Sequence, residues 1–117
     1  MKVYREGTGE KYTPFNHHDM KTQVIFNPET GSKHANVTLS LITKETTMDE
    51  EIHENSDQIF YIMQGQMKVW QNGQLVQTLN KGDAVLVEAG DVHGVSTEID
   101  EPCIYYAVTV PPLEKTH

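Results

Sequence analysis

The sequence predicts an all-β protein built from about nine short antiparallel strands. Runs rich in β-branched and aromatic residues alternate polar and apolar positions, as half-buried strands do. Gly, Asn and Pro separate these runs, and no stretch shows the 3.6-residue period of a helix. At 117 residues the chain suits one domain with a single core. A small barrel or jelly roll is the architecture that such a series favours.

The predicted elements begin with an N-terminal arm at 1–20, which carries few apolar positions, and continue in a β-domain over 21–117. Within that domain the strand signals recur at short intervals. The predicted strands are 22–26, 36–42, 51–54, 58–64, 66–71, 74–79, 84–88, 92–97 and 104–110.

The turns between the strands are well marked. Asn72-Gly73 lies between two alternating runs and predicts a tight hairpin, because both residues accept the positive φ that a type I′ turn requires. Gly82 and Gly90 predict turns on either side of strand 84–88, and Pro111-Pro112 ends the last strand.

Composition excludes several classes of function. Seventeen acidic residues against nine basic ones give a net charge of -8, and no Lys/Arg cluster is present, so we expect no nucleic-acid partner. The chain has neither an apolar signal core nor a membrane-length apolar run, so we expect a cytoplasmic protein with no membrane partner. The single Cys103 is expected to be a buried thiol.

One polar segment, 51–58, and His93 form the candidate site. Glu51 and His53 are two residues apart and share a strand face, while His93 follows a Gly turn. Two imidazoles and a carboxylate are costly to bury unless they are paired or hold a cation. Glu51 could instead belong to a solvated acidic turn, and a register that pairs His53 with Asn55 remains open.

The spacing of these residues resembles the two-motif signature of the cupin superfamily. Gly82-x5-Glu88-Ala89-Gly90-x2-His93 is similar to the second motif, with Glu88 in place of the usual Pro. Together with Thr30 to His34, Glu51 to His53, Asp57 to Phe60 and Tyr106 to Pro112, it resembles small single-domain bacterial cupins described as mannose-6-phosphate-isomerase-like. Tyr61 departs from that subgroup, where Arg is expected, but strand alternation points it away from Gln58.

This resemblance implies a double-stranded β-helix and a metal site. Alignment on Gly65 gives the ligands Glu51, His53, Gln58 and His93, with Gln58 as the weaker oxygen ligand. Such a set suits one divalent transition metal: Mn, Fe, Zn, Ni or Co. His17 and His18, in the arm, are expected to be exposed, and His34 either lines the rim of the pocket or ends a loop.

The expected function is Lewis-acid catalysis on a small oxygenated substrate, such as a sugar or a hydroxy or keto acid, by an isomerase, epimerase or lyase. Glu51 is the candidate catalytic residue. A non-haem dioxygenase, a non-catalytic module that binds a metal or small ligand, and a structural barrel without metal are the alternatives. Small cupins commonly pair through a terminal strand, so we expect a homodimer.

Overall fold

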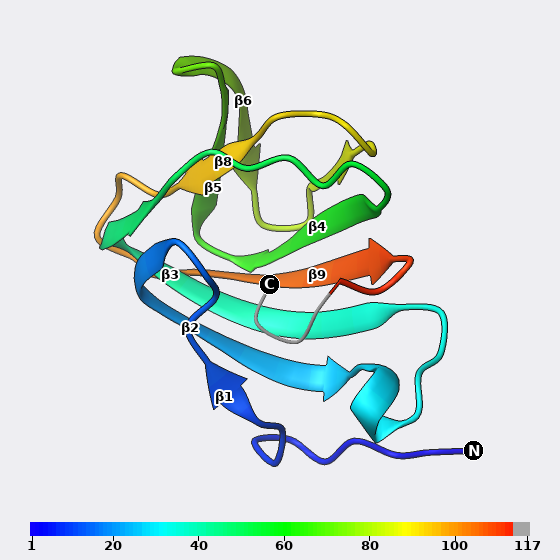
Figure 1. Cartoon of the computed structure of the whole chain (residues 1–117). Coiled ribbons are helices and arrows are strands. Elements are labelled where there is room, and N and C mark those ends of the chain that lie inside the picture. Colours follow the sequence, from blue (N-terminus) through cyan, green and yellow to red (C-terminus); the bar gives the residue numbers. More distant parts are fainter. Residues whose placement is uncertain (114–117) are drawn as a thin grey trace.

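The computed structural model describes residues 1–113 and shows an all-β fold of two antiparallel sheets (Figure 1). The larger sheet has the order β1-β2-β3-β9-β4-β7, and the smaller has the order β6-β5-β8. The strands are β1 (Lys11–Tyr12), β2 (His17–Phe26), β3 (Asn36–Met48), β4 (Asp57–Gln64), β5 (Gln66–Gln71), β6 (Gln74–Asn80), β7 (Ala84–Val87), β8 (Gly94–Ser96) and β9 (Cys103–Val110). The only helical element in the described chain is a 3-10 turn at Pro28–Thr30. The predicted all-β class is confirmed.

Two predicted elements differ from the observed ones. Segment 51–54 is not a strand: within it only Glu51 pairs, in an isolated bridge with His93. The segment expected to be an arm, 1–20, contributes β1 and the start of β2 to the larger sheet, because β2 begins at His17. Of the histidines, His117 lies outside the described residues.

The interior follows the alternation that the sequence shows. On β4, Gln58, Phe60 and Ile62 are buried, whereas Ile59 and Tyr61 on the opposite face are 43% and 44% exposed. The prediction that Tyr61 points away from Gln58 is therefore confirmed. The core cluster consists of Met20, Ile42, Phe60, Ile62, Met67, Val69, Leu79, Val87, Val95, Cys103, Tyr105 and Ala107.

The hairpin between β5 and β6 also forms as predicted. Asn72 and Gly73 have φ values of 52° and 74°, which suit a two-residue turn between twisted strands. The Glu50 carboxylate accepts hydrogen bonds from both backbone N–H groups, at 2.6 and 2.7 Å. This contact fixes the residue just before Glu51 to the smaller sheet.

Candidate metal centre

Backbone pairing brings Glu51 and His93 together from two different loops. Each residue donates its N–H to the other's carbonyl oxygen, at 2.8 and 3.0 Å, and the Gly90 N–H donates to the His53 carbonyl at 2.9 Å. The connection from β3 to β4 carries Glu51, and in Figure 1 it passes along β8. Strand β8 begins directly after His93, the residue with which Glu51 pairs. The two loops are thus joined by main-chain hydrogen bonds, so their side chains are held in a fixed relation.

The three side chains converge on a common point. Glu51 Oε1 lies 3.3 Å from His53 Nε2 and 3.8 Å from His93 Nε2. One ligand atom from each residue lies within 4.8 Å of the other two. Both imidazoles are buried, whereas the Glu51 side chain is 27% exposed. Two nitrogens and one oxygen at this spacing can surround a single metal ion.

Buried polar atoms at the site fit a cation. His93 Nδ1 lies 3.2 Å from the Asp91 carbonyl, which can only accept, so Nδ1 carries the proton and Nε2 presents its lone pair. Gln58 Nε2 donates to Thr109 Oγ1 at 3.0 Å. His93 Nε2 and Gln58 Oε1 are buried and have no hydrogen-bond partner within residues 1–113. A metal ion or its bound water would satisfy such atoms.

The surroundings set the charges of the site. Burial lowers the pKa of His93, because charging an imidazole away from water is unfavourable. Burial alone would raise the pKa of Glu51, but the hydrogen bond and charge of His53, with the charges of His17 and His93, outweigh it and leave that pKa below its usual value. At neutral pH the His93 imidazole is therefore neutral and the Glu51 carboxylate is ionised, which are the forms that bind metals. Acidification would protonate both groups and weaken metal binding.

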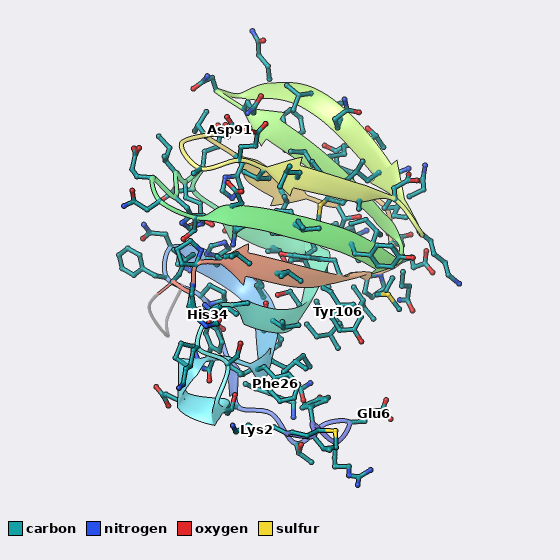
Figure 2. All side chains as sticks on the ribbon, turned by 90° about the vertical axis from the view of Figure 1, so that its right-hand side faces the viewer. Lys2, Glu6, Phe26, His34, Asp91 and Tyr106 are labelled. Atoms are coloured by element: carbon teal, nitrogen blue, oxygen red, sulfur yellow. The ribbon has the colours of Figure 1, made fainter. Side chains whose placement is uncertain are left out.

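Of the four predicted ligands, the structure brings Glu51, His53 and His93 into one cluster and places Gln58 on the wall of the same pocket. Asn55 is exposed, which leaves no support for the register that pairs it with His53. His34 is exposed as well, and Figure 2 shows it well apart from Asp91, which leads into His93.

One histidine of the pocket was not predicted to lie there. His17 was expected to be exposed, and that expectation is wrong: its side chain is buried, and its Nε2 lies 4.0 Å from Glu51 Oε1. His18 is exposed, as predicted. Neighbouring strand residues point to opposite faces, so one of this pair had to face the interior once the segment joined the sheet. The sequence gives no strong strand signal before residue 20, which is why this was missed.

The pocket is small and is lined mainly by the inner face of the larger sheet. Its volume is about 40 Å³, and its lining includes Tyr12, Pro14 and His17 from the N-terminal segment. A second cavity of about 220 Å³ shares Tyr12, Asn36 and Thr38 with it. Since one water needs roughly 10–15 Å³, the inner pocket has room for an ion with a few waters, and larger ligands would have to extend into the outer cavity.

Comparison with known proteins identifies the family. A model described as "Cupin domain" matches residues 38–109, which is more than half of the chain. The chain belongs to the cupin family. The predicted resemblance to the cupin superfamily is thereby confirmed, and the two-sheet fold is that of a cupin jelly roll. His17 lies outside the matched region, so this cupin's pocket includes a residue that the family match does not cover.

Three solved structures show the same fold. KdgF from Halomonas sp. is 16% identical with a TM-score of 0.78, and the alignment covers 100% of this chain and 99% of that one. A polyketide cyclase, RemF from Streptomyces resistomycificus, is 17% identical with a TM-score of 0.80, covering 99% and 89%. A predicted oxalate decarboxylase from Thermotoga maritima is 19% identical with a TM-score of 0.78, covering 95% and 100%.

At these identities the likeness establishes the cupin fold alone. No curated protein matches this chain in sequence. Within the described part of the chain, no helix has both the length and the apolar character that crossing a membrane requires.

Proposed function

We propose that this cupin is a metal-dependent enzyme acting on a small oxygenated substrate such as a sugar or a hydroxy or keto acid. Glu51, His53 and His93 would hold one divalent transition-metal ion, and the Gln58 amide oxygen would be a weaker ligand or bind its water. The observation that carries the proposal is the convergence of these three buried or half-buried side chains, with His93 Nε2 lacking a hydrogen-bond partner in residues 1–113. When bound, the ion would supply Lewis acidity toward a substrate oxygen.

The protein groups around the site support a polar substrate. Asn36 Oδ1 is buried with no partner within the described residues, at the boundary between the inner pocket and the outer cavity. Burial, followed by the charge of Glu10, raises the pKa of Tyr12 on the same boundary, so its phenol stays protonated and can donate. An acceptor and a donor placed there suit the hydroxyl groups of a sugar-sized ligand.

Glu51 is the proposed proton acceptor in steps where its carboxylate leaves the ion. The side chain lines the pocket and is partly exposed, and its lowered pKa keeps it ionised at neutral pH. Such a group can take a proton from a carbon or hydroxyl next to the ion, as isomerases and lyases require. The two-His, one-carboxylate set also favours a second candidate, a non-haem iron dioxygenase, because this set is typical of such enzymes.

The first test is metal content and specificity. Purified protein is analysed for bound metals. The protein is then freed of metal with a chelator, and its thermal unfolding midpoint is measured with and without added Mn²⁺, Fe²⁺, Co²⁺, Ni²⁺ or Zn²⁺. We expect a stoichiometric site and a rise in midpoint that His93→Ala abolishes. Protein that neither carries nor responds to any of these ions would overturn the proposal and leave a barrel without metal.

The second test separates the candidate functions. The metal-loaded protein is incubated in D₂O with a panel of sugars, uronic acids, hydroxy acids and keto acids, and products are followed by NMR. Isomerisation, elimination or metal-dependent deuterium incorporation would support Lewis-acid chemistry. Oxygen consumption only with Fe²⁺ would support the dioxygenase. Binding of a panel member with neither turnover nor exchange would support a non-catalytic module.

We also propose a homodimer formed through the outer face of the larger sheet. Six large apolar side chains on β3, β4, β7 and β9 are 36–55% exposed there: Leu41, Ile59, Tyr61, Met63, Leu86 and Val110. Apolar side chains gathered on one face of a sheet are typical of protein–protein interaction sites. These six side chains carry no charge and suit the same face of a second copy, because copies with a net charge of -8 repel each other elsewhere.

Molar mass in solution tests the dimer. Light scattering is expected to give twice the chain mass for the native protein and one chain mass for Ile59→Glu with Leu86→Glu. Leu75→Glu is the matched control, because Leu75 is 45% exposed on β6 of the other sheet. A native monomer, or a dimer that only the control disrupts, would contradict this interface.

A further inference from the structure

The backbone around His17 departs from regular strand geometry on both sides. Asn16 and Asp19 have φ values of 58° and 55°, in the left-handed region that Asn and Asp enter more readily than most residues. The pairing of β2 with β3 shifts register between His18 and Met20. Bulges of this kind re-aim side chains and are frequent beside active sites. Here they determine which of two adjacent histidines faces the pocket.

The two adjacent histidines, His17 and His18, lie in different environments. His17 is 9% exposed and lines the pocket, whereas His18 is exposed. The segment is anchored to the loop that carries Glu51: His17 pairs with Met48, and the Asp49 N–H donates to the Asn16 carbonyl at 3.3 Å. The position of the His17 ring relative to Glu51 is therefore fixed by the main chain.

The His17 imidazole is also oriented in the way that a metal ligand requires. Its Nδ1 lies 2.6 Å from the Phe15 carbonyl, an acceptor, so Nδ1 carries the proton and Nε2 presents a lone pair. His93 has the same arrangement with the Asp91 carbonyl. A backbone carbonyl that fixes the tautomer of an imidazole is a regular companion of metal-binding histidines.

We propose that His17 is the third imidazole ligand of the metal ion, which gives a shell of three histidines and one carboxylate. This inference rests on the proposed metal site. The distance from His17 Nε2 to Glu51 Oε1 is 4.0 Å. Two ligand atoms that each lie roughly 2.0–2.2 Å from one ion are at most about 4.4 Å apart. His17 stands outside the tighter group of Glu51, His53 and His93, so binding would draw its ring inward by a small movement.

This assignment gives the N-terminal segment a role. The ion would tie β2 to the loops before β4 and β8. Both loops lie within the residues that the family model matches, 38–109, whereas residue 17 lies outside them. Gln58, a neutral amide already donating to Thr109, would then stay a weak ligand or bind a metal-bound water. The shell would hold four protein ligands, and an ion that accepts more than four would still bind water and substrate.

The full chain offers a matched pair of variants. Zn²⁺ affinity is measured by chelator competition for the native protein, His17→Ala and His18→Ala. We expect His17→Ala to lose at least roughly tenfold in affinity, the lower end of what even an outer partner costs, and His18→Ala to match the native protein. Unfolding midpoints without metal identify any loss of fold, and His17→Gln, which keeps the size of the side chain, must also weaken binding.

Long-range ¹H–¹⁵N NMR of the imidazoles counts the ligands directly. Addition of Zn²⁺ is expected to shift the Nε2 signals of three histidines in the native protein and in His18→Ala, and of two in His17→Ala. Two shifted signals in the native protein, or equal affinity of the two alanine variants, would overturn the role of His17 while leaving the metal site standing. No shifted signal at all would overturn both proposals.

Discussion

The two ends of the barrel interior are built by the same strands and differ in chemistry. At the polar end, β4 and β9 contribute Gln58 and Thr109 beside Glu51, His53 and His93. At the apolar end, the same strands and their neighbours contribute Ile42, Ile62, Met67 and Cys103, which are all fully buried. Phe60 lies between the two ends, with ring centroids 6.0 Å from His93 and 5.3 Å from Tyr105.

This gradient along adjacent strands shows how the fold can tolerate buried polar atoms without hydrogen bonds. The apolar end excludes water and packs closely, which supplies stability. The polar end keeps atoms such as His93 Nε2 without a partner in residues 1–113, which costs stability in the absence of an ion. Stability and function are therefore expected to respond to different substitutions on the same strands.

The largest effect expected is on metal binding at the polar end. His93→Ala removes a buried nitrogen ligand, and we expect the affinity for Zn²⁺ to fall by more than about 100-fold, beyond the range for outer partners. Chelator competition and metal analysis measure it. A variant that keeps stoichiometric metal at native affinity would show that His93 is not a ligand.

At the apolar end, Ile62→Ala tests whether the two ends are separable. Ile62 is 0% exposed, so its truncation is expected to lower the free energy of unfolding by about 2–5 kcal/mol. Urea unfolding of the metal-free protein measures this. The folded variant should bind Zn²⁺ within a few-fold of the native affinity.

Ile59→Ala is the matched control for this substitution. Ile59 lies on the same strand but is 43% exposed on the outer face, so we expect a much smaller loss in the monomer at low protein concentration. Equal losses for Ile59 and Ile62 would contradict the assignment of inner and outer faces on β4.

The pH dependence of stability is expected to originate at the polar end. The pKa of His93 lies below its ordinary value of 6.5 in the folded protein, so the unfolded chain binds the proton first. The free energy of unfolding of the metal-free protein should therefore fall as the pH drops below about 6.5. Glu51, whose pKa lies below 4.5, should add a further loss only below about pH 4.5.

Urea unfolding of the metal-free native protein and His93→Ala from pH 8 to pH 5 checks the sign. The native protein should lose more stability over this range than the variant, while Ile62→Ala should follow the native slope. Identical slopes for the native protein and His93→Ala would remove His93 as the source.

The smallest effect is expected from Gln58→Ala. A neutral amide oxygen is a weaker ligand than an imidazole, and Gln58 already donates to Thr109 at 3.0 Å. Zn²⁺ affinity should fall by about tenfold or less, well short of His93→Ala. A loss as large as that of His93→Ala would place Gln58 among the strong ligands.

The sequence by itself determined most strands and turns of the barrel and the residues of the two motifs, but not the bridge at Glu51 or the strands before residue 20. Alternation assigned Gln58, Phe60 and Ile62 to the interior and Tyr61 to the outer face, because side chains on a strand point to opposite sides. Asn72-Gly73 fixed a hairpin because few residues accept positive φ. The spacing of Glu51, His53 and His93 was enough to predict a cluster that could hold a metal.

Only the tertiary structure decided the rest of the pocket. Glu51 meets His93 through a single bridge between loops and not within a strand, a contact that local periodicity does not encode. His17 faces inward because left-handed residues at 16 and 19 and a register shift orient it, and such bulges interrupt the alternation by which a sequence is interpreted. The inner cavity depends on how the N-terminal segment packs against β3, β4, β8 and β9, because long-range packing sets its volume.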